Sequence, residues 1–135
     1  MQTLMDPPMA AWVLLAGRGS IALVFLVSAI HKAFWYQKAV EEFTVDGVPL
    51  ISISLPGTIL LHFGGAFCLI LGLHAELAAL LLAIHTLAAT CMVHGFWRIE
   101  GIDRLIRSRI FLANLGVIGG LLYIAAIGPG SLAVG

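Results

Sequence analysis

Charged residues are scarce in this chain of 135 residues, because only 10% are Asp, Glu, Lys or Arg, against about 25% in ordinary soluble domains. Seven Lys and Arg balance seven Asp and Glu, so no net charge attracts nucleic acid. The only two cysteines, Cys68 and Cys91, lie separately in long apolar runs, which provides neither a disulfide framework nor a clustered zinc site. With 61% hydrophobic residues, so short a chain has more apolar surface than a soluble globule buries. The composition therefore predicts an integral membrane protein in contact with lipid.

Four segments are long and apolar enough to cross about 30 Å of hydrocarbon. Continuous apolar runs favour helices over membrane strands, which alternate in character. A break at Pro56-Gly57 precedes the second segment, His74 lies in a tight turn between the second and third, and Gly128-Pro129-Gly130 ends the fourth. We therefore predict an all-α membrane protein, a single domain over residues 1–135, folded as an up-down bundle of four transmembrane helices. The predicted spans are residues 9–36, 57–73, 75–97 and 105–127.

The connections predict the orientation of the bundle. Six cations lie in or beside the first and third connections: Lys32, Lys38, Arg98, Arg104, Arg107 and Arg109. On the other side Arg18 is the only one. The positive-inside rule places connections 37–56 and 98–104 in the cytoplasm and both termini outside, in a prokaryotic cytoplasmic (inner) membrane. Within the longer connection, the apolar stretch 48–55 is expected to form a short amphipathic or re-entrant segment at the interface.

Small residues at four-residue spacing predict where helices approach one another. They are Gly64, Cys68 and Gly72 on the second span, and Gly116 and Gly120 on the fourth. Small side chains let helix backbones come close in a membrane.

Three histidines lie at a similar depth near the predicted cytoplasmic ends of their spans: His31, His62 and His94. They could bind a metal, hold a quinone head group, relay protons, or serve only as hydrogen-bonding groups between helices. Because adjacent residues on a helix point about 100° apart, His31 and Lys32 cannot both face the centre. Lys32, His62 and His94 are the residues we expect around an inner polar pocket, and no catalytic residue is assigned.

The remaining intramembrane polar residues have predicted structural partners. His85 lies near mid-membrane, with Asn114 on the fourth span as its expected partner. His62 and His85 differ in predicted depth by about 10 Å, which disfavours a haem held between them. Arg18 either pairs with Glu76 or reaches the interface alone, leaving Glu76 in the favourable first turn of its helix.

Short motifs in a fixed order make the chain similar to the DoxX family of small four-span membrane proteins. The motifs are Gly17-Arg18 with Lys32, Gly64-Gly65, Gly72-Leu73, His94-Gly95-Phe96-Trp97, Phe111-Leu112-Ala113-Asn114-Leu115, and Gly128-Pro129-Gly130. The resemblance departs at two positions, since His62 stands where the family usually has Glu, and Glu76 where it usually has Arg. It implies an association with membrane redox systems, as in an archaeal thiosulfate:quinone oxidoreductase.

These observations favour a small membrane subunit of a larger, quinone-linked redox complex, in which the chain supports a quinone or proton site. Partners would be the lipid bilayer and other membrane subunits, with quinone as the possible cofactor. No dinucleotide loop, CxxCH or cysteine cluster is present in the sequence, so catalysis by the chain alone is not expected. A purely structural or assembly protein, and a small transporter or proton-conducting unit, are the alternatives.

Overall fold

A computed structural model describes residues 6–135, and this part of the chain is helical without any strand. The elements are α1 (Pro7–Phe34), α2 (Tyr36–Val45), α3 (Ile51–Leu71), α4 (Ala75–Val93), the single 3-10 turn η1 (Phe96–Arg98) and α5 (Gly101–Ile127). Four of them, α1, α3, α4 with its extension through Arg98, and α5, are long and apolar enough to cross a membrane. The predicted all-α membrane fold with four spans is confirmed.

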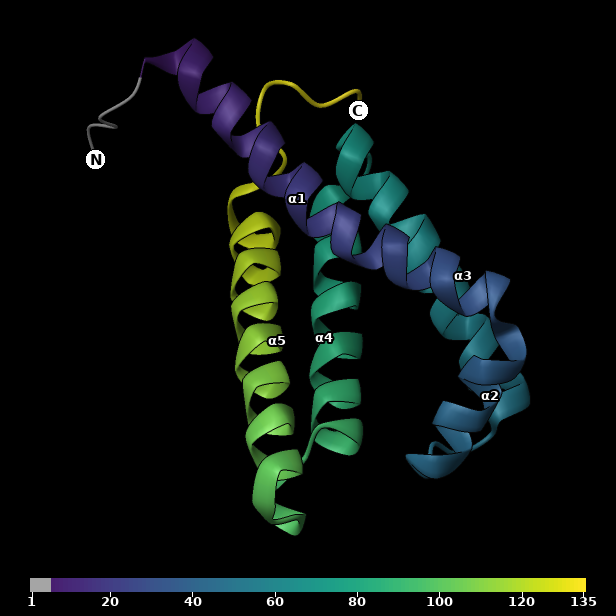
Figure 1. The fold of residues 1–135 in the computed structure, drawn as a ribbon. Coiled ribbons are helices and arrows are strands. Elements are labelled where there is room, and N and C mark those ends of the chain that lie inside the picture. Colours follow the sequence, from purple (N-terminus) through teal and green to yellow (C-terminus); the bar gives the residue numbers. More distant parts are fainter. Residues whose placement is uncertain (1–5) are drawn as a thin grey trace.

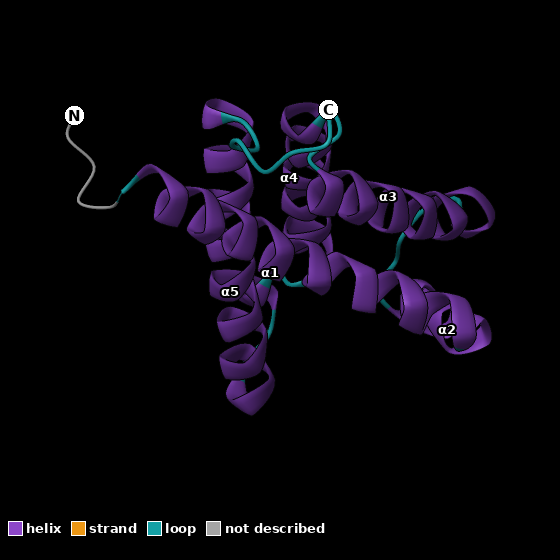
Figure 2. Cartoon of the chain, turned by 90° about the horizontal axis from the view of Figure 1, so that it is seen from above, coloured by secondary structure: helices purple, strands orange, loops and turns teal. Residues whose placement is uncertain are grey.

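The helices are arranged as two pairs, α1 with α3 and α4 with α5 (Figure 1). The beginning of α1, the C-terminal segment after α5 and the α3–α4 turn lie at one end of the molecule, which we call the terminal end (Figure 1). The connections at residues 35–50 and 94–100 lie at the opposite end, which we call the loop end. Seen from above, α1 and α3 run obliquely to α4 and α5 (Figure 2). The two pairs therefore meet at the terminal end and diverge toward the loop end.

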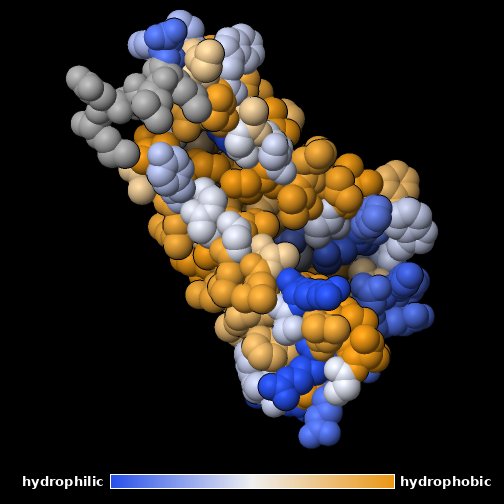
Figure 3. Space-filling model, turned by 60° about the vertical axis from the view of Figure 1, so that its left-hand side comes forward, coloured by the Kyte–Doolittle hydropathy of each residue, from blue (hydrophilic) through white to orange (hydrophobic). Residues whose placement is uncertain are grey.

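Buried side chains from all four long helices fill the contact between the pairs. The buried cluster includes Phe25 of α1, Leu69 of α3, Leu82 of α4 and Leu121 of α5. Most other apolar side chains point outward, and Figure 3 shows a broad apolar surface over the middle of the molecule, with polar side chains gathered toward the loop end. Such a distribution is typical of a bundle solvated by lipid.

Two predictions about the second span and its approach are wrong. Helix α3 begins at Ile51, before Pro56, and residues 51–55 form its first turn instead of an interfacial segment. Proline removes the hydrogen bond to the carbonyl four residues earlier and crowds that carbonyl, and that residue, Ser52, is exposed in the first turn of the helix. The short helix between the first two spans is α2, which packs against α1 and α3 and precedes the predicted segment.

The glycines at which helices come close agree only in part with those predicted from four-residue spacing. A Cβ added at Gly65 would meet Leu82 at 2.8 Å, and one at Gly120 would meet Ile21 at 2.6 Å. Gly64 and Gly116 have no neighbouring atom within 4 Å of such a Cβ, so they do not bring helices of this chain together. Periodicity identifies a row of small residues but leaves the rotation of the helix undetermined.

Arg18 fastens the C-terminal segment across the terminal end. Its side chain is only 2% exposed and donates to the carbonyls of Pro129, Leu132 (2.7 Å) and Ile70 (3.4 Å). The segment is also tied to α3, because the Val134 N–H donates to the Leu71 carbonyl at 2.8 Å. One guanidinium thus joins α1, α3 and the residues after α5.

The Arg18–Glu76 ion pair, one of the two alternatives left open by the sequence, is absent from the described residues. Glu76 is exposed in the first turn of α4, and its carboxylate approaches Gly128, where an added Cβ would meet it at 3.0 Å. The depths of Arg18 and Glu76 estimated from the sequence were compatible with an ion pair between them. The guanidinium instead reaches carbonyls of the folded-back tail, whose path could not be derived from the spans.

Replacing Arg18 by Met should weaken the bundle, because three backbone carbonyls lose a charged donor. We expect a loss of about 3 kcal/mol in the free energy of unfolding, measured by titration with sodium dodecyl sulfate. The control is Arg109→Met, at an exposed position on α5. Equal stability of the two variants would contradict the structural role of Arg18.

Candidate functional site

A cavity of about 510 Å³ lies between the diverging helix pairs. It extends from His85 and Val117 in the interior to residues 46–49 of the loop end. Its walls are mostly apolar. Polar side chains come from five helices, namely Ser28 and Lys32, Glu42, Ser54, Thr58 and His62, His85 and Thr86, and Asn114, and from Asp46 and His94 just after helices. The volume lies in the range of about 300–1,000 Å³ that small-molecule sites occupy.

Three polar side chains form a connected group on one wall. Lys32 Nζ donates to Ser28 Oγ at 2.7 Å, and Ser28 Oγ lies 3.2 Å from His62 Nδ1. Positions 25, 28 and 32 share one face of α1 because side chains three and four residues apart are neighbours on a helix. The Phe25 ring packs edge-on against His62 with ring centroids 5.0 Å apart. The group therefore links α1 to α3 beside an aromatic wall.

His62 and His85 are in contact, contrary to the predicted separation in depth. Their ring centroids lie 5.0 Å apart and the rings are nearly perpendicular, at 86°. His62 lies eleven residues after the start of α3 at Ile51, and His85 lies eight residues before the end of α4 at Val93. The difference is only about 5 Å at 1.5 Å per residue. The error came from starting the second span at residue 57, six residues after α3 begins.

His62 has one ring nitrogen without a partner. The side chain is only 8% exposed, and its Nε2 atom is buried with no hydrogen-bond partner in the described residues. A buried polar group in this state costs free energy comparable to a lost hydrogen bond. Within a cavity, such an atom favours a bound ligand.

Asn114 pairs with a residue other than the expected His85. Its Nδ2 donates to Thr90 Oγ1 at 2.9 Å, and Thr90 is completely buried. This contact joins α5 to α4 near the cavity wall. The prediction considered height alone, and the rotation of α5 directs the amide donor to Thr90.

The other two histidines of the predicted level lie apart. His94 follows α4 and lines the cavity near the loop end, whereas His31 is exposed and packs edge-on against Trp35, with centroids 5.1 Å apart. In residues 6–135, no group of three or more His, Cys, Asp or Glu side chains is arranged to hold a metal ion. Lys32, His62 and His94 share the lining of one cavity, and His31 does not join them.

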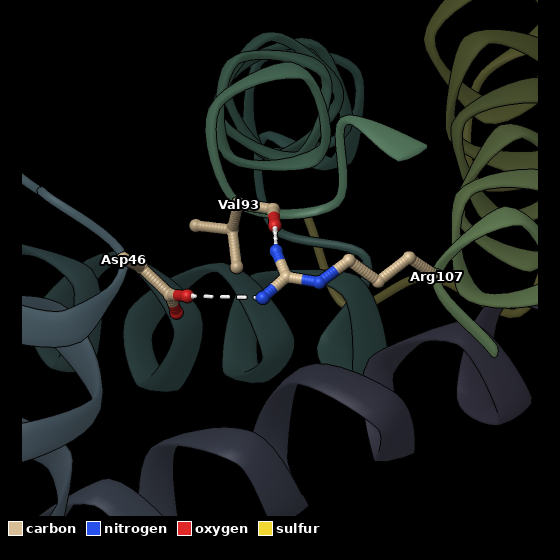
Figure 4. Close-up of polar contacts among 3 residues, drawn as sticks. All are labelled: Asp46, Val93 and Arg107. Carbon is tan, nitrogen blue, oxygen red and sulfur yellow. Dashed lines mark hydrogen bonds and ion pairs between the residues drawn. The ribbon is translucent and has the colours of Figure 1, made fainter. Parts of the chain in front are cut away.

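Arg107 bridges the loop end of the cavity. It donates to the Val93 carbonyl at the end of α4, and its Nη2 lies 3.8 Å from the Asp46 carboxylate after α2 (Figure 4). A second cavity of about 460 Å³ adjoins the same three residues and His94. The bridge joins α5 to both sides of the opening.

Sequence reasoning missed Ser28, Asp46 and Arg107 as site residues. Ser28 lies one helical turn before Lys32 on the same stripe of α1, which was a usable signal. Asp46 lies just after α2, and Arg107 lies near the beginning of α5, far away in sequence. In the sequence analysis Arg107 counted only as one of the cations that predict the orientation. Their pairing follows from the tertiary fold.

The fold and cavity define a small polytopic membrane protein with a polar-lined interior. The chain belongs to the DoxX family, whose model matches residues 13–95. It is 30% identical over 120 residues to the inner membrane protein YqjF of Escherichia coli strain K12, a match that covers 89% of this chain and 87% of that protein. No solved structure matches the chain significantly. The resemblance read from the motifs is confirmed at the level of the family.

Loss of the Arg107 bridge should open the cavity toward water. In a chain whose two cysteines are replaced by Ala, we would label Ala89→Cys, on the cavity wall, with a water-soluble maleimide. Arg107→Ala should raise the labelling rate about fivefold, because a partly exposed ion pair contributes up to about 1 kcal/mol. Arg109→Ala is the matched control, and equal rates in the two variants would show that the bridge does not restrict entry.

Proposed function

We propose that this protein is a membrane subunit of a larger redox complex and that its cavity holds a quinone head group. The observation that carries the proposal is the buried, unpartnered Nε2 of His62, a residue that lines a cavity of about 510 Å³. His62 and Lys32 would donate to a quinone carbonyl, and His94 would exchange protons near the opening. The partner subunit would supply the electron carrier.

The shape of the cavity supports a ligand with a polar head and an apolar body. Polar groups converge at Ser28, Lys32 and His62, whereas Phe25, Met92 and Val117 provide apolar wall. Ligand sites of this kind bury an apolar body and orient it with a few polar contacts. A quinone ring with its isoprenoid tail has this division.

The proposed orientation places the loop end in the cytoplasm, because the cations in and beside the two connections lie there. The similarity to an inner membrane protein of Escherichia coli supports a prokaryotic cytoplasmic membrane as the location. Head group and protons would then enter from the cytoplasmic side. Toward the terminal end, Leu69, Leu82 and Leu121 are completely buried, so a continuous polar path across the bundle, as a proton conductor or transporter requires, would have to pass this apolar layer.

Replacing His62 by Leu should lower the quinone content and the quinone-linked turnover of the purified complex. We expect a reduction of about tenfold, because a carbonyl ligand loses one buried donor. His31→Leu is the matched control, since His31 is exposed outside the cavity. Quinone content and turnover equal to wild type, with full membrane insertion of both variants, would refute the site.

A purely structural or assembly role is the second candidate, and exposed small residues favour it. Gly64 on α3 and Gly116 on α5 are exposed with no atom of this chain close to them, which leaves room for helices of another subunit. In that case the polar residues would serve only as internal hydrogen-bonding groups.

Substitution at Gly116 tests this second candidate. Gly116→Leu should leave the chain folded but reduce the recovery of partner subunits at least fivefold in mild-detergent purification, measured by mass spectrometry, because the added side chain meets only a partner. Gly120→Leu is the contrasting variant, because it collides with Ile21 and should destabilise the chain itself. Unchanged recovery with Gly116→Leu would exclude this face as an assembly surface.

A further inference from the structure

We propose that Ser28 fixes the proton of His62 on Nε2 and so makes the inner wall of the cavity a site for an acceptor oxygen. The ligand would present a carbonyl or an oxyanion at one end of an apolar body. The inference rests on the proposed function in using the same cavity, and it specifies the chemistry that this cavity selects. Ser28 acts as a positioning residue in this proposal.

The hydrogen-bond inventory around Ser28 determines which His62 nitrogen carries the proton. The Lys32 ammonium has no acceptor capacity, so it donates to Ser28 Oγ over the 2.7 Å contact. The Ser28 hydroxyl can then donate to His62 Nδ1 over 3.2 Å, which leaves only the Nε2–H unsatisfied. The opposite tautomer would leave two groups unsatisfied, the Ser28 hydroxyl proton and the Nε2 lone pair. Because unmade buried hydrogen bonds are costly, the first arrangement is favoured.

Lys32 also supplies hydrogen-bond donors to the site. Its ammonium has further N–H groups beyond the one that bonds Ser28. Among the described residues no carboxylate lies within 4.0 Å of the Lys32 ammonium. The ion pair of this part of the chain joins Arg107 and Asp46 instead. The Lys32 ammonium and the His62 imidazole, which both line the cavity, therefore each keep an N–H without a partner among the described residues.

Two donors on one wall discriminate between ligand oxygens. A quinone carbonyl or a carboxylate accepts from both. A quinol or an alcohol adds a hydrogen atom of its own, which must find an acceptor elsewhere. Specificity of this kind arises because the wrong ligand leaves buried polar groups unpaired. The site should therefore prefer a quinone to its quinol, and a fatty carboxylate to the matching alcohol.

The test uses the full-length protein in nanodiscs and four probes measured by equilibrium dialysis, with empty nanodiscs to subtract partition into lipid. The probes are a short-tail benzoquinone, its quinol under anaerobic conditions, octanoate and octanol. We expect the quinone to bind about tenfold more tightly than the quinol, and octanoate about tenfold more tightly than octanol. The quinone and quinol pair, both neutral, reports hydrogen-bond polarity without a contribution from the charge of Lys32.

Variants of Ser28 separate positioning from simple packing. Ser28→Ala should reduce the quinone-to-quinol preference to about twofold or less, and Ser28→Thr, which keeps the hydroxyl, should restore it. Ser20→Ala is the matched control on the same helix, because Ser20 is exposed and bonds only the Ala16 carbonyl. The imidazole 15N shifts of His62 should report a protonated Nε2 in wild type and a mixture of tautomers in Ser28→Ala.

The outcomes distinguish this inference from the proposed function. Octanoate binding that depends on Ser28, without quinone binding, would support the acceptor-oxygen site and overturn the quinone role. Equal binding of quinone and quinol, or a preference unchanged in Ser28→Ala, would overturn the inference and leave the quinone role standing. Failure of every probe to bind the folded protein would overturn both.

Discussion

The divergence of the two helix pairs is the constraint on which the interior depends. Helices α1 and α3 pack together, as do α4 and α5, and the pairs cross obliquely (Figures 1 and 2). No Cα atoms of α1 and α4 lie within 8 Å of each other in the described residues. The space between them would be filled by side chains in a parallel bundle. Here Phe25, Leu69, Leu82 and Leu121 fill it only toward the terminal end, and the remainder is the cavity.

Polar contacts hold this arrangement at three levels. At the terminal end Arg18 binds the carbonyls of the C-terminal segment, in the interior Asn114 joins α5 to Thr90 of α4, and at the loop end Arg107 reaches Asp46. In the interior of the bundle lipid offers the Asn114 amide no water, so it must find a partner in the protein. The first two contacts are substantially buried, whereas the third is partly exposed and therefore weaker. The loop end is thus the side where the structure can open at least cost.

The four spans were predictable because lipid imposes a length and an apolar character that can be read directly along the chain. The turn at His74 was equally clear, since few residues separate two long apolar runs. The start of α3 was not, because Pro56 is a reliable sign of a helix end in water but is tolerated near the beginning of a membrane helix. An error of six residues there shifted the apparent depth of His62 by about 9 Å. The false separation from His85 followed from that shift.

The sequence by itself determined a small membrane protein of four helices and showed which polar groups its spans carry. Only the tertiary structure decided which of these groups touch. Contact between side chains depends on helix rotation and crossing angle, and these result from packing among residues distant in sequence. The pairing of Arg18 with the C-terminal segment and of Ser28 with His62 has this origin. Hydropathy identifies the segments that span the membrane, whereas the packed core determines which neighbour each side chain meets.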